Sequence, residues 1–120
     1  MQTDEANEQA ALMAAENWLA LIDTGEVAES WNQAARLFKS VVPLEQWQAA
    51  VAAAQVPLGK PVSRRLKSKQ YAEELPGAPD GRYFVLEYET SFEHKKQGTE
   101  TITPMLDKDG EWRVSGYYVK

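Results

Sequence analysis

The residue types that most often carry catalysis are scarce in this sequence. His94 is the only histidine, and the chain contains no cysteine. The lack of cysteine excludes thiolate metal sites and a cysteine nucleophile, and a single histidine argues against a histidine-built zinc site. General-base catalysis by His94 would require a geometry that its charged surroundings, "EHKKQG" (93–98), do not favour, because such a segment is typical of a solvated turn.

"DKDG" (107–110), followed by Glu111, resembles the beginning of a calcium-binding loop. The segment lacks the third acidic position and the distant bidentate glutamate that such loops supply. Asp-Gly between two alternating segments is more typical of a β-hairpin turn. We therefore expect no metal site, no cofactor and no catalytic residue.

The basic cluster "SRRLKSK" (63–69) has two interpretations. It would suit a phosphate or an acidic partner, or it would form an edge strand whose basic residues discourage aggregation and pair with Glu87 and Glu89. The edge strand is the favoured interpretation. The formal net charge of −5 argues against a general nucleic-acid binder, because phosphate binding depends on lysine and arginine.

The first half of the 120-residue chain has the apolar spacing of amphipathic helices. We expect one helix over 5–23, a second over 27–38 and a third within 41–59. Each carries one tryptophan on its apolar face: Trp18, Trp31 and Trp47. These large side chains need an apolar surface to bury them, which the second half of the chain must supply.

After Pro61 the apolar pattern changes to the alternation of β-strands. Four strands are expected, within 61–75, 82–94, 99–106 and 111–120, joined by turns that form an antiparallel meander. No repeat or linker interrupts the pattern. The sequence therefore predicts a single α+β domain over 1–120, with residues 1–5 disordered and three N-terminal helices packed on a curved four-stranded sheet.

The alternation also predicts the register of the sheet. Inward side chains would meet in three cross-strand rows: Leu86 with Leu106 and Trp112, Tyr88 with Pro104 and Val114, and Thr90 with Ile102 and Gly116. Pro104 cannot donate to the ladder and Gly116 weakens the next strand, so we expect a bulge that bends the sheet there. The helices would fill the concave side.

Four segments together resemble a known family: "NWLALIDTGEVAESW", "LGKPVSRRLKS", "LPGAPDGRYFVLEYETSF" and "TITPMLDKDGEWRVSGYYVK". Over nearly the whole chain they are similar to the uncharacterised bacterial family catalogued as domain of unknown function four thousand and nineteen. The resemblance implies a cystatin-like fold, in the manner of nuclear transport factor 2 and ketosteroid isomerase, in which helices pack into a curved antiparallel sheet. It implies no reaction and no catalytic residues.

A cone between helices and sheet would form a pocket with four candidate ligand-binding residues: Trp47, Arg64, Tyr88 and Trp112. Arg64 and Tyr88 would suit an anionic ligand. An enzyme of the isomerase or dehydratase type, the alternative, would need an inward carboxylate, and Glu100 is expected near the open end. The other nearby glutamates are expected to point outward: Glu87, Glu89 and Glu111. The aromatic residues would otherwise fill the cone as core.

Four residues leave apolar surface on the expected outer face of the sheet: Tyr83, Val85, Tyr117 and Val119. Such a patch is typical of a homodimer contact or a structural assembly. The polar run 1–9 would suit either a mature periplasmic or secreted bacterial domain or an ordinary N-terminus. No stretch approaches the roughly 20 apolar residues of a membrane span. The leading prediction is a non-enzymatic module that binds a small molecule or a protein partner.

Overall fold

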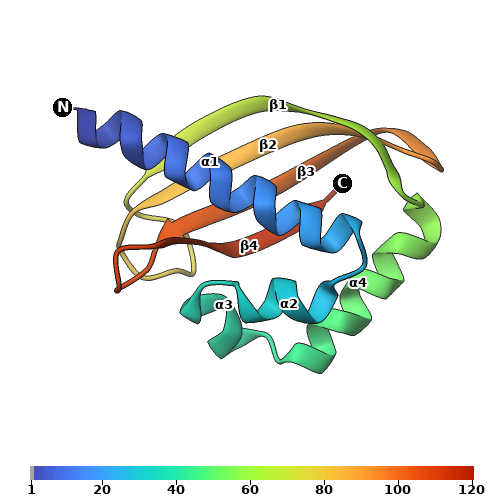
Figure 1. Cartoon of the computed structure of the whole chain (residues 1–120), viewed down its shortest axis with the longest axis horizontal. Coiled ribbons are helices and arrows are strands. Elements are labelled where there is room, and N and C mark those ends of the chain that lie inside the picture. Colours follow the sequence, from blue (N-terminus) through green and yellow to red (C-terminus); the bar gives the residue numbers. More distant parts are fainter. Residues whose placement is uncertain (1) are drawn as a thin grey trace.

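The computed structural model describes residues 2–120 and has the helical half and the sheet half that the sequence predicts (Figure 1). The helices are α1 (Gln2–Asp23), α2 (Val27–Asn32), α3 (Arg36–Val41) and α4 (Leu44–Leu58). The strands are β1 (Pro61–Ala72), β2 (Tyr83–Phe92), β3 (Lys95–Leu106) and β4 (Trp112–Val119). The expected disorder of residues 1–5 falls on residue 1, which lies outside the described residues, and on the first residues of α1.

The first helix, α1, follows the predicted apolar spacing. Its buried side chains recur three or four residues apart along one face: Ala11, Ala15, Trp18, Leu19 and Ile22. Gly25 ends the helix with a φ of 86°, a left-handed conformation that glycine adopts without steric cost. The Glu26 amide then donates to the Leu21 carbonyl at 2.7 Å, so the chain turns sharply into α2.

The segment 27–38, expected as one helix, instead forms the two short helices α2 and α3. Between them, Ala35 is extended, with φ −62° and ψ 154°, and its amide donates to the Val114 carbonyl of β4 at 2.8 Å. The next amide, of Arg36, donates to Asp107 Oδ2 at 3.2 Å. These contacts with β4 and with the turn between β3 and β4 replace two intrahelical hydrogen bonds, and the predicted single helix is therefore wrong.

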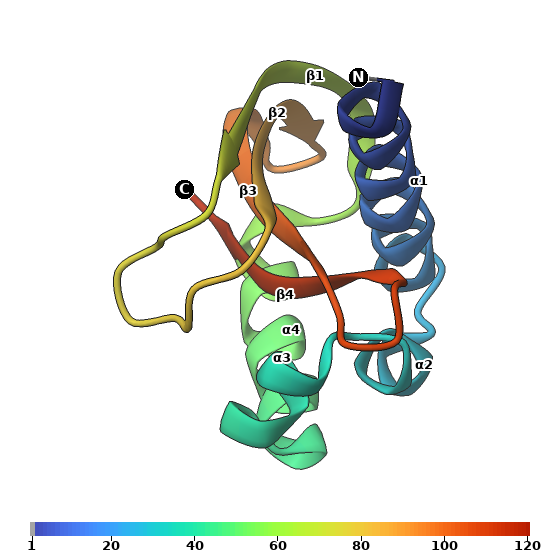
Figure 2. The same cartoon turned by 90° about the vertical axis from the view of Figure 1, so that its left-hand side faces the viewer.

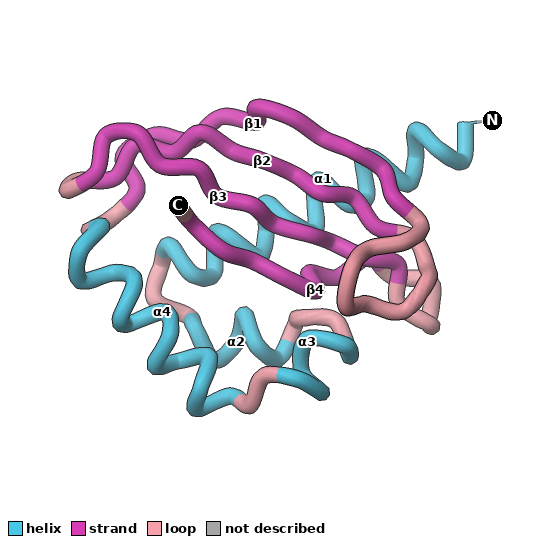
Figure 3. Tube along the Cα trace, turned by 180° about the vertical axis from the view of Figure 1, so that it is seen from behind, coloured by secondary structure: helices cyan, strands magenta, loops and turns pink. Residues whose placement is uncertain are grey.

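The four strands form the predicted antiparallel meander, in the order β1-β2-β3-β4. The sheet is curved, and α1 lies along its concave face (Figure 2). On the opposite side, the β1–β2 loop (73–82) folds over the end of the sheet (Figure 3). The hydrogen bonds that hold this loop include one from the Tyr83 hydroxyl to the Pro79 carbonyl and one from the Leu106 amide to the Arg82 carbonyl.

The register between β2 and β3 differs from the prediction by four residues. Phe92 pairs with Lys95, so the turn contains only two residues rather than the whole segment 94–98. Leu86 therefore pairs with Ile102 instead of Leu106. The same shift places Glu100 directly opposite Tyr88, well inside the sheet.

The bulge expected at Pro104 is present between β3 and β4. Pro104 pairs with Val114 as predicted, but Thr103 pairs with Gly116, so Ser115 is an extra residue in β4. An extra residue exchanges the two faces of a strand beyond it. Tyr117, which was expected on the outer face, consequently faces inward, where it packs against Trp18, whereas Tyr118 is 54% exposed.

The core lies between the helices and the concave face of the sheet. At its centre is a cluster of four aromatic side chains whose ring centroids lie 5.1–6.4 Å apart: Trp18, Phe38, Trp47 and Tyr117. Trp18 and Trp47 also donate to Ser30, at its carbonyl and its hydroxyl respectively. No helix among residues 2–120 is long and apolar enough to cross a membrane.

Candidate functional site

A cavity of about 670 Å³ opens where α1 and α4 end beside the sheet. Most of its wall is apolar, and α4 supplies the largest share: Trp47, Ala50, Val51, Ala54 and Leu58. Ile22, Phe92 and Val119 extend this wall on the other elements. The volume lies within the range of about 300–1,000 Å³ that is typical of small-molecule pockets.

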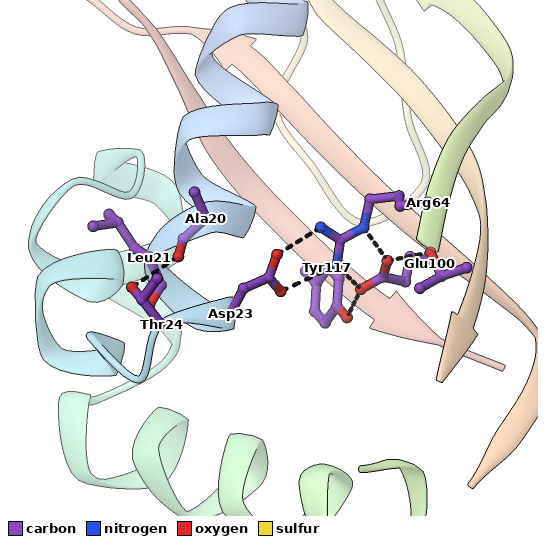
Figure 4. Close-up of polar contacts among 8 residues, drawn as sticks. Ala20, Leu21, Asp23, Thr24, Arg64, Glu100 and Tyr117 are labelled. Atoms are coloured by element: carbon purple, nitrogen blue, oxygen red, sulfur yellow. Dashed lines mark hydrogen bonds and ion pairs between the residues drawn. The ribbon is translucent and has the colours of Figure 1, made fainter. Parts of the chain in front are cut away.

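The polar end of this cavity is built around Glu100 of β3, whose side chain is only 2% exposed. Its Oε1 accepts hydrogen bonds from Arg64 Nε at 2.7 Å and from the Thr90 hydroxyl at 2.5 Å. Its Oε2 accepts from Arg64 Nη2 at 3.2 Å and from the Tyr117 hydroxyl at 2.5 Å (Figure 4). Four donors thus satisfy a buried carboxylate that would otherwise be costly to desolvate.

Arg64 of β1 joins Glu100 to the end of α1. Its Nη1 and Nη2 donate to the two oxygens of Asp23, at 2.8 Å and 3.2 Å, in a bidentate pair (Figure 4). Burial alone would lower the pKa of Arg64, but hydrogen bonds and charges from Asp23 and Glu100 outweigh burial and raise that pKa. The guanidinium is therefore always charged and is shared between two carboxylates.

Tyr117 serves the network as a permanent donor. Burial, followed by the charge of Glu100 and the hydrogen bond to it, raises the pKa of the Tyr117 hydroxyl above its ordinary value. The hydroxyl therefore stays protonated at neutral pH. We name the four linked residues Asp23, Arg64, Glu100 and Tyr117 the polar cluster.

The sequence patterns did not indicate Asp23, and they predicted a different position for Glu100. Glu100 shares the inward face with Gly98 and Ile102, and this alternation was the available signal. The expected turn was too long, which put Glu100 near the open end instead of opposite Tyr88. No sequence pattern indicated that Asp23 belongs to the site, because an acidic residue that ends an amphipathic helix is usually solvated.

The structure brings together only two of the four predicted pocket residues. Trp47 and Arg64 line the cavity, Arg64 on the inward face as the strand alternation allowed. Tyr88 is 3% exposed and belongs to the core instead. Trp112 lies beside a separate groove along α1, where its indole donates to Asn7 Oδ1 at 3.2 Å.

The four predicted interface residues do not form one outer patch. Tyr83 is only 1% exposed, since the β1–β2 loop covers it. Tyr117 and Val119 both line the cavity, because the bulge turns this part of β4 over. Val85 alone stays partly exposed on the outer face. A homodimer through that face stays a prediction, but Tyr117 and Val119 are not available to it.

The remaining motifs have structural roles. Asp107–Glu111 forms the predicted hairpin turn, with Gly110 at a φ of 87°. Asp109 binds Arg113 through two 2.8 Å contacts, and these hydrogen bonds lower the pKa of Asp109 to about 2. Arg65 pairs with Glu89 across the β1–β2 ladder, as the edge-strand interpretation predicts. Among residues whose side chains are described, no three acidic, histidine or cysteine residues are grouped as metal ligands.

Tyr88 offers a prediction about stability, because its buried hydroxyl has no hydrogen-bond partner among the described residues. An unsatisfied buried hydroxyl costs about 1–3 kcal/mol, so Tyr88→Phe is expected to raise the free energy of unfolding by about 1 kcal/mol in urea titrations at pH 7. Burial, then the charge of Glu16, raises the pKa of Tyr88 to about 12.

The same variant gives a pH-dependent readout. A tyrosine in the unfolded chain ionises near pH 10, so the folded protein, with its higher pKa, loses stability as the pH rises from about 10 to 12. Tyr88→Phe removes this contribution, and its advantage over the native protein should grow across that range. A variant that is less stable than the native protein at pH 7 would contradict the unpartnered hydroxyl.

Comparison with known families confirms the resemblance that the sequence indicated. A family described as Protein of unknown function (DUF4019) matches residues 14–117, which include the whole polar cluster. The chain therefore belongs to this family. No curated protein and no solved structure matches the chain, and the cystatin-like name for its fold stays a prediction.

Proposed function

We propose that this domain binds a small amphipathic molecule in the cavity between α1, α4 and the sheet. One observation carries the proposal: a single cavity of about 670 Å³ has an extended apolar wall and a polar cluster at one end. Small-molecule sites commonly combine apolar walls with a few convergent polar groups. The wall would bury the body of the ligand, and the cluster would orient its polar head.

The wall is suited to a short aliphatic or ring-shaped body. Ligand efficiencies range from about 0.3 kcal/mol per non-hydrogen atom for drug-sized ligands to about 1.5 kcal/mol for the best small ones. At an intermediate value of about 0.5–0.75 kcal/mol per atom, the nine non-hydrogen atoms of octan-1-ol give a dissociation constant between about 10 μM and 1 mM. This range is accessible to calorimetry.

The polar cluster favours binding over catalysis. A general base needs a free lone pair within reach of the substrate, whereas both oxygens of Glu100 already accept two hydrogen bonds. Arg64 is held by two carboxylates, so it is poorly placed as an electrophile. This arrangement argues against the isomerase or dehydratase alternative.

Filling the cavity should abolish binding. Ala54 of α4 lines the cavity and is half-buried, so Ala54→Trp would place an indole in the space of the ligand. We expect this variant to bind octan-1-ol at least about tenfold more weakly than the native protein, measured by titration calorimetry.

A matched control distinguishes the cavity from the surface of α4. Ala53 is exposed and does not line the cavity, so Ala53→Trp adds the same side chain to the same helix and should leave octan-1-ol binding unchanged. Equal loss in both variants, or no binding by the native protein at millimolar octan-1-ol, would refute the proposed function.

A further inference from the structure

We infer that the ligand of this cavity carries a positively charged head group, such as an ammonium, and an apolar body. This inference rests on the proposed function and adds the chemical class of the ligand. It reverses the anionic preference expected from Arg64 in the sequence. Three independent features of the cavity support it: its hydrogen-bonding groups, its net charge and the helix ends that surround it.

The polar cluster has acceptors to spare and almost no donors. Arg64 has five N–H groups. Four of them already bond to carboxylates: Nε to Glu100, one at Nη1 to Asp23, and two at Nη2 to Asp23 and Glu100. The Tyr117 hydroxyl donates its one proton to Glu100. An incoming anion would therefore find one free N–H of the guanidinium.

Asp23 is the group that remains open to a ligand. Its side chain is 29% exposed, compared with 2% for Glu100, and each of its oxygens accepts one bond from Arg64. A carboxylate has about four lone-pair sites, so about two remain. A head group with several N–H donors and a positive charge is the natural partner of these sites.

The charged side chains around the cavity leave a net negative charge. Asp23, Glu93 and Glu100 are acidic, and Lys60 and Arg64 are basic, which gives a formal charge of −1. Lys60 and Glu93 are exposed, and their charges contribute little to the potential inside the cavity because water screens them. The inner groups alone, two carboxylates on one guanidinium, give the same sign.

Two helices also end at the cavity. The C-terminal residues of α1 and of α4 both line it, and each helix C-terminus carries about half a negative charge from its aligned peptide dipoles. Asp23 is itself the last residue of α1, where a carboxylate is disfavoured by that dipole. At this end of α1 the Thr24 hydroxyl has the Ala20 and Leu21 carbonyls (Figure 4) and Glu26 Oε2 as acceptors within hydrogen-bond distance, so its proton is not directed at Asp23.

An eight-carbon series tests the sign of the head group at constant chain length. At pH 7, octylamine is cationic, octan-1-ol is neutral and octanoate is anionic. We expect the native protein to bind octylammonium at least about tenfold more tightly than octanoate by titration calorimetry in low salt. Asp23→Asn removes the open carboxylate and should reduce this ratio at least about fivefold.

Asp80→Asn is the matched control, because it makes the same change in net charge on the β1–β2 loop, away from the cavity. It should leave the ratio unchanged. If octan-1-ol binds, and octanoate binds as tightly as octylammonium, the inferred cationic class of the ligand is wrong but the proposed function stands. If none of the three probes binds, both the proposed function and this inference fail. An equal reduction in Asp23→Asn and Asp80→Asn would also overturn the inference, since it would reflect overall charge rather than Asp23.

Discussion

Replacing Glu100 with alanine is expected to lower the free energy of unfolding by about 3–5 kcal/mol. The carboxylate is 2% exposed and accepts hydrogen bonds from three side chains, so its removal leaves two buried hydroxyls and part of a guanidinium without their acceptor. Arg64 keeps its pair with Asp23, and the domain should still fold. The change is measured from urea unfolding curves followed by tryptophan fluorescence.

Glu89→Ala is the control for this prediction. Glu89 lies on the neighbouring strand β2 and pairs with Arg65, but its side chain is 42% exposed. An exposed ion pair contributes about 0–1 kcal/mol, so this variant should lose little stability. Equal losses in the two variants would show that Glu100 is not buried as described. Glu100→Gln, which preserves the volume, is expected to fall between them.

Trp18→Ala should have an effect of similar size, about 3–5 kcal/mol. The Trp18 ring lies at the centre of the core, with its centroid 5.4 Å from that of Trp47 and 5.6 Å from that of Tyr117. Its indole also donates to the Ser30 carbonyl at 2.8 Å. Truncation therefore leaves a large void and an unpaired Ser30 carbonyl. The void lies next to Trp47 and Tyr117, which both line the cavity.

The exposed residue Met13 on the same helix provides the comparison. Met13 is 62% exposed, and Met13→Ala should change the free energy of unfolding by no more than about 0.5 kcal/mol. Both variants are measured by urea denaturation. A loss below about 1 kcal/mol for Trp18→Ala would mean that α1 does not pack on the sheet as the structure has it.

The layers of this fold follow from patterns that the sequence displays directly. The period of the apolar residues changes near Pro61, and the structure changes from helix to strand at the same place. Turn-forming residues separate the strands, and a meander is the simplest connection between them. The identity of each layer was therefore predictable, as was the bend at Pro104. The inward position of Arg64 depended on the register of β1, which the sequence left open.

The break between α2 and α3 was not predictable in the same way. Nothing in the local sequence stops a helix at residues 33–35, and the apolar spacing continues through them. The amides of Ala35 and Arg36 are instead satisfied by Val114 and Asp107, which are more than 70 residues away in sequence. Tertiary contacts of this kind override local helix propensity.

The arrangement of the polar cluster depends on two details of how the strands pair. A two-residue turn rather than a longer one moved Glu100 opposite Tyr88, and the extra residue Ser115 turned Tyr117 toward it. Both changes involve register, which alternation alone does not specify, because several turn lengths keep the same faces inward. The sequence consequently supplied the residues of the polar cluster without showing that they meet.

Binding of a ligand in the cavity beside Trp47 can be observed directly in a proton–nitrogen NMR spectrum of the four tryptophan indoles during titration with octan-1-ol. Each indole N–H has a different acceptor, so the four signals should be resolved. Trp47 lines the cavity and Trp112 lies beside the separate groove along α1. We expect the Trp47 signal to shift most and the Trp112 signal not to move if octan-1-ol binds in the cavity. A shift confined to Trp112, or binding that leaves the Trp47 signal unchanged, would contradict a ligand site in this cavity.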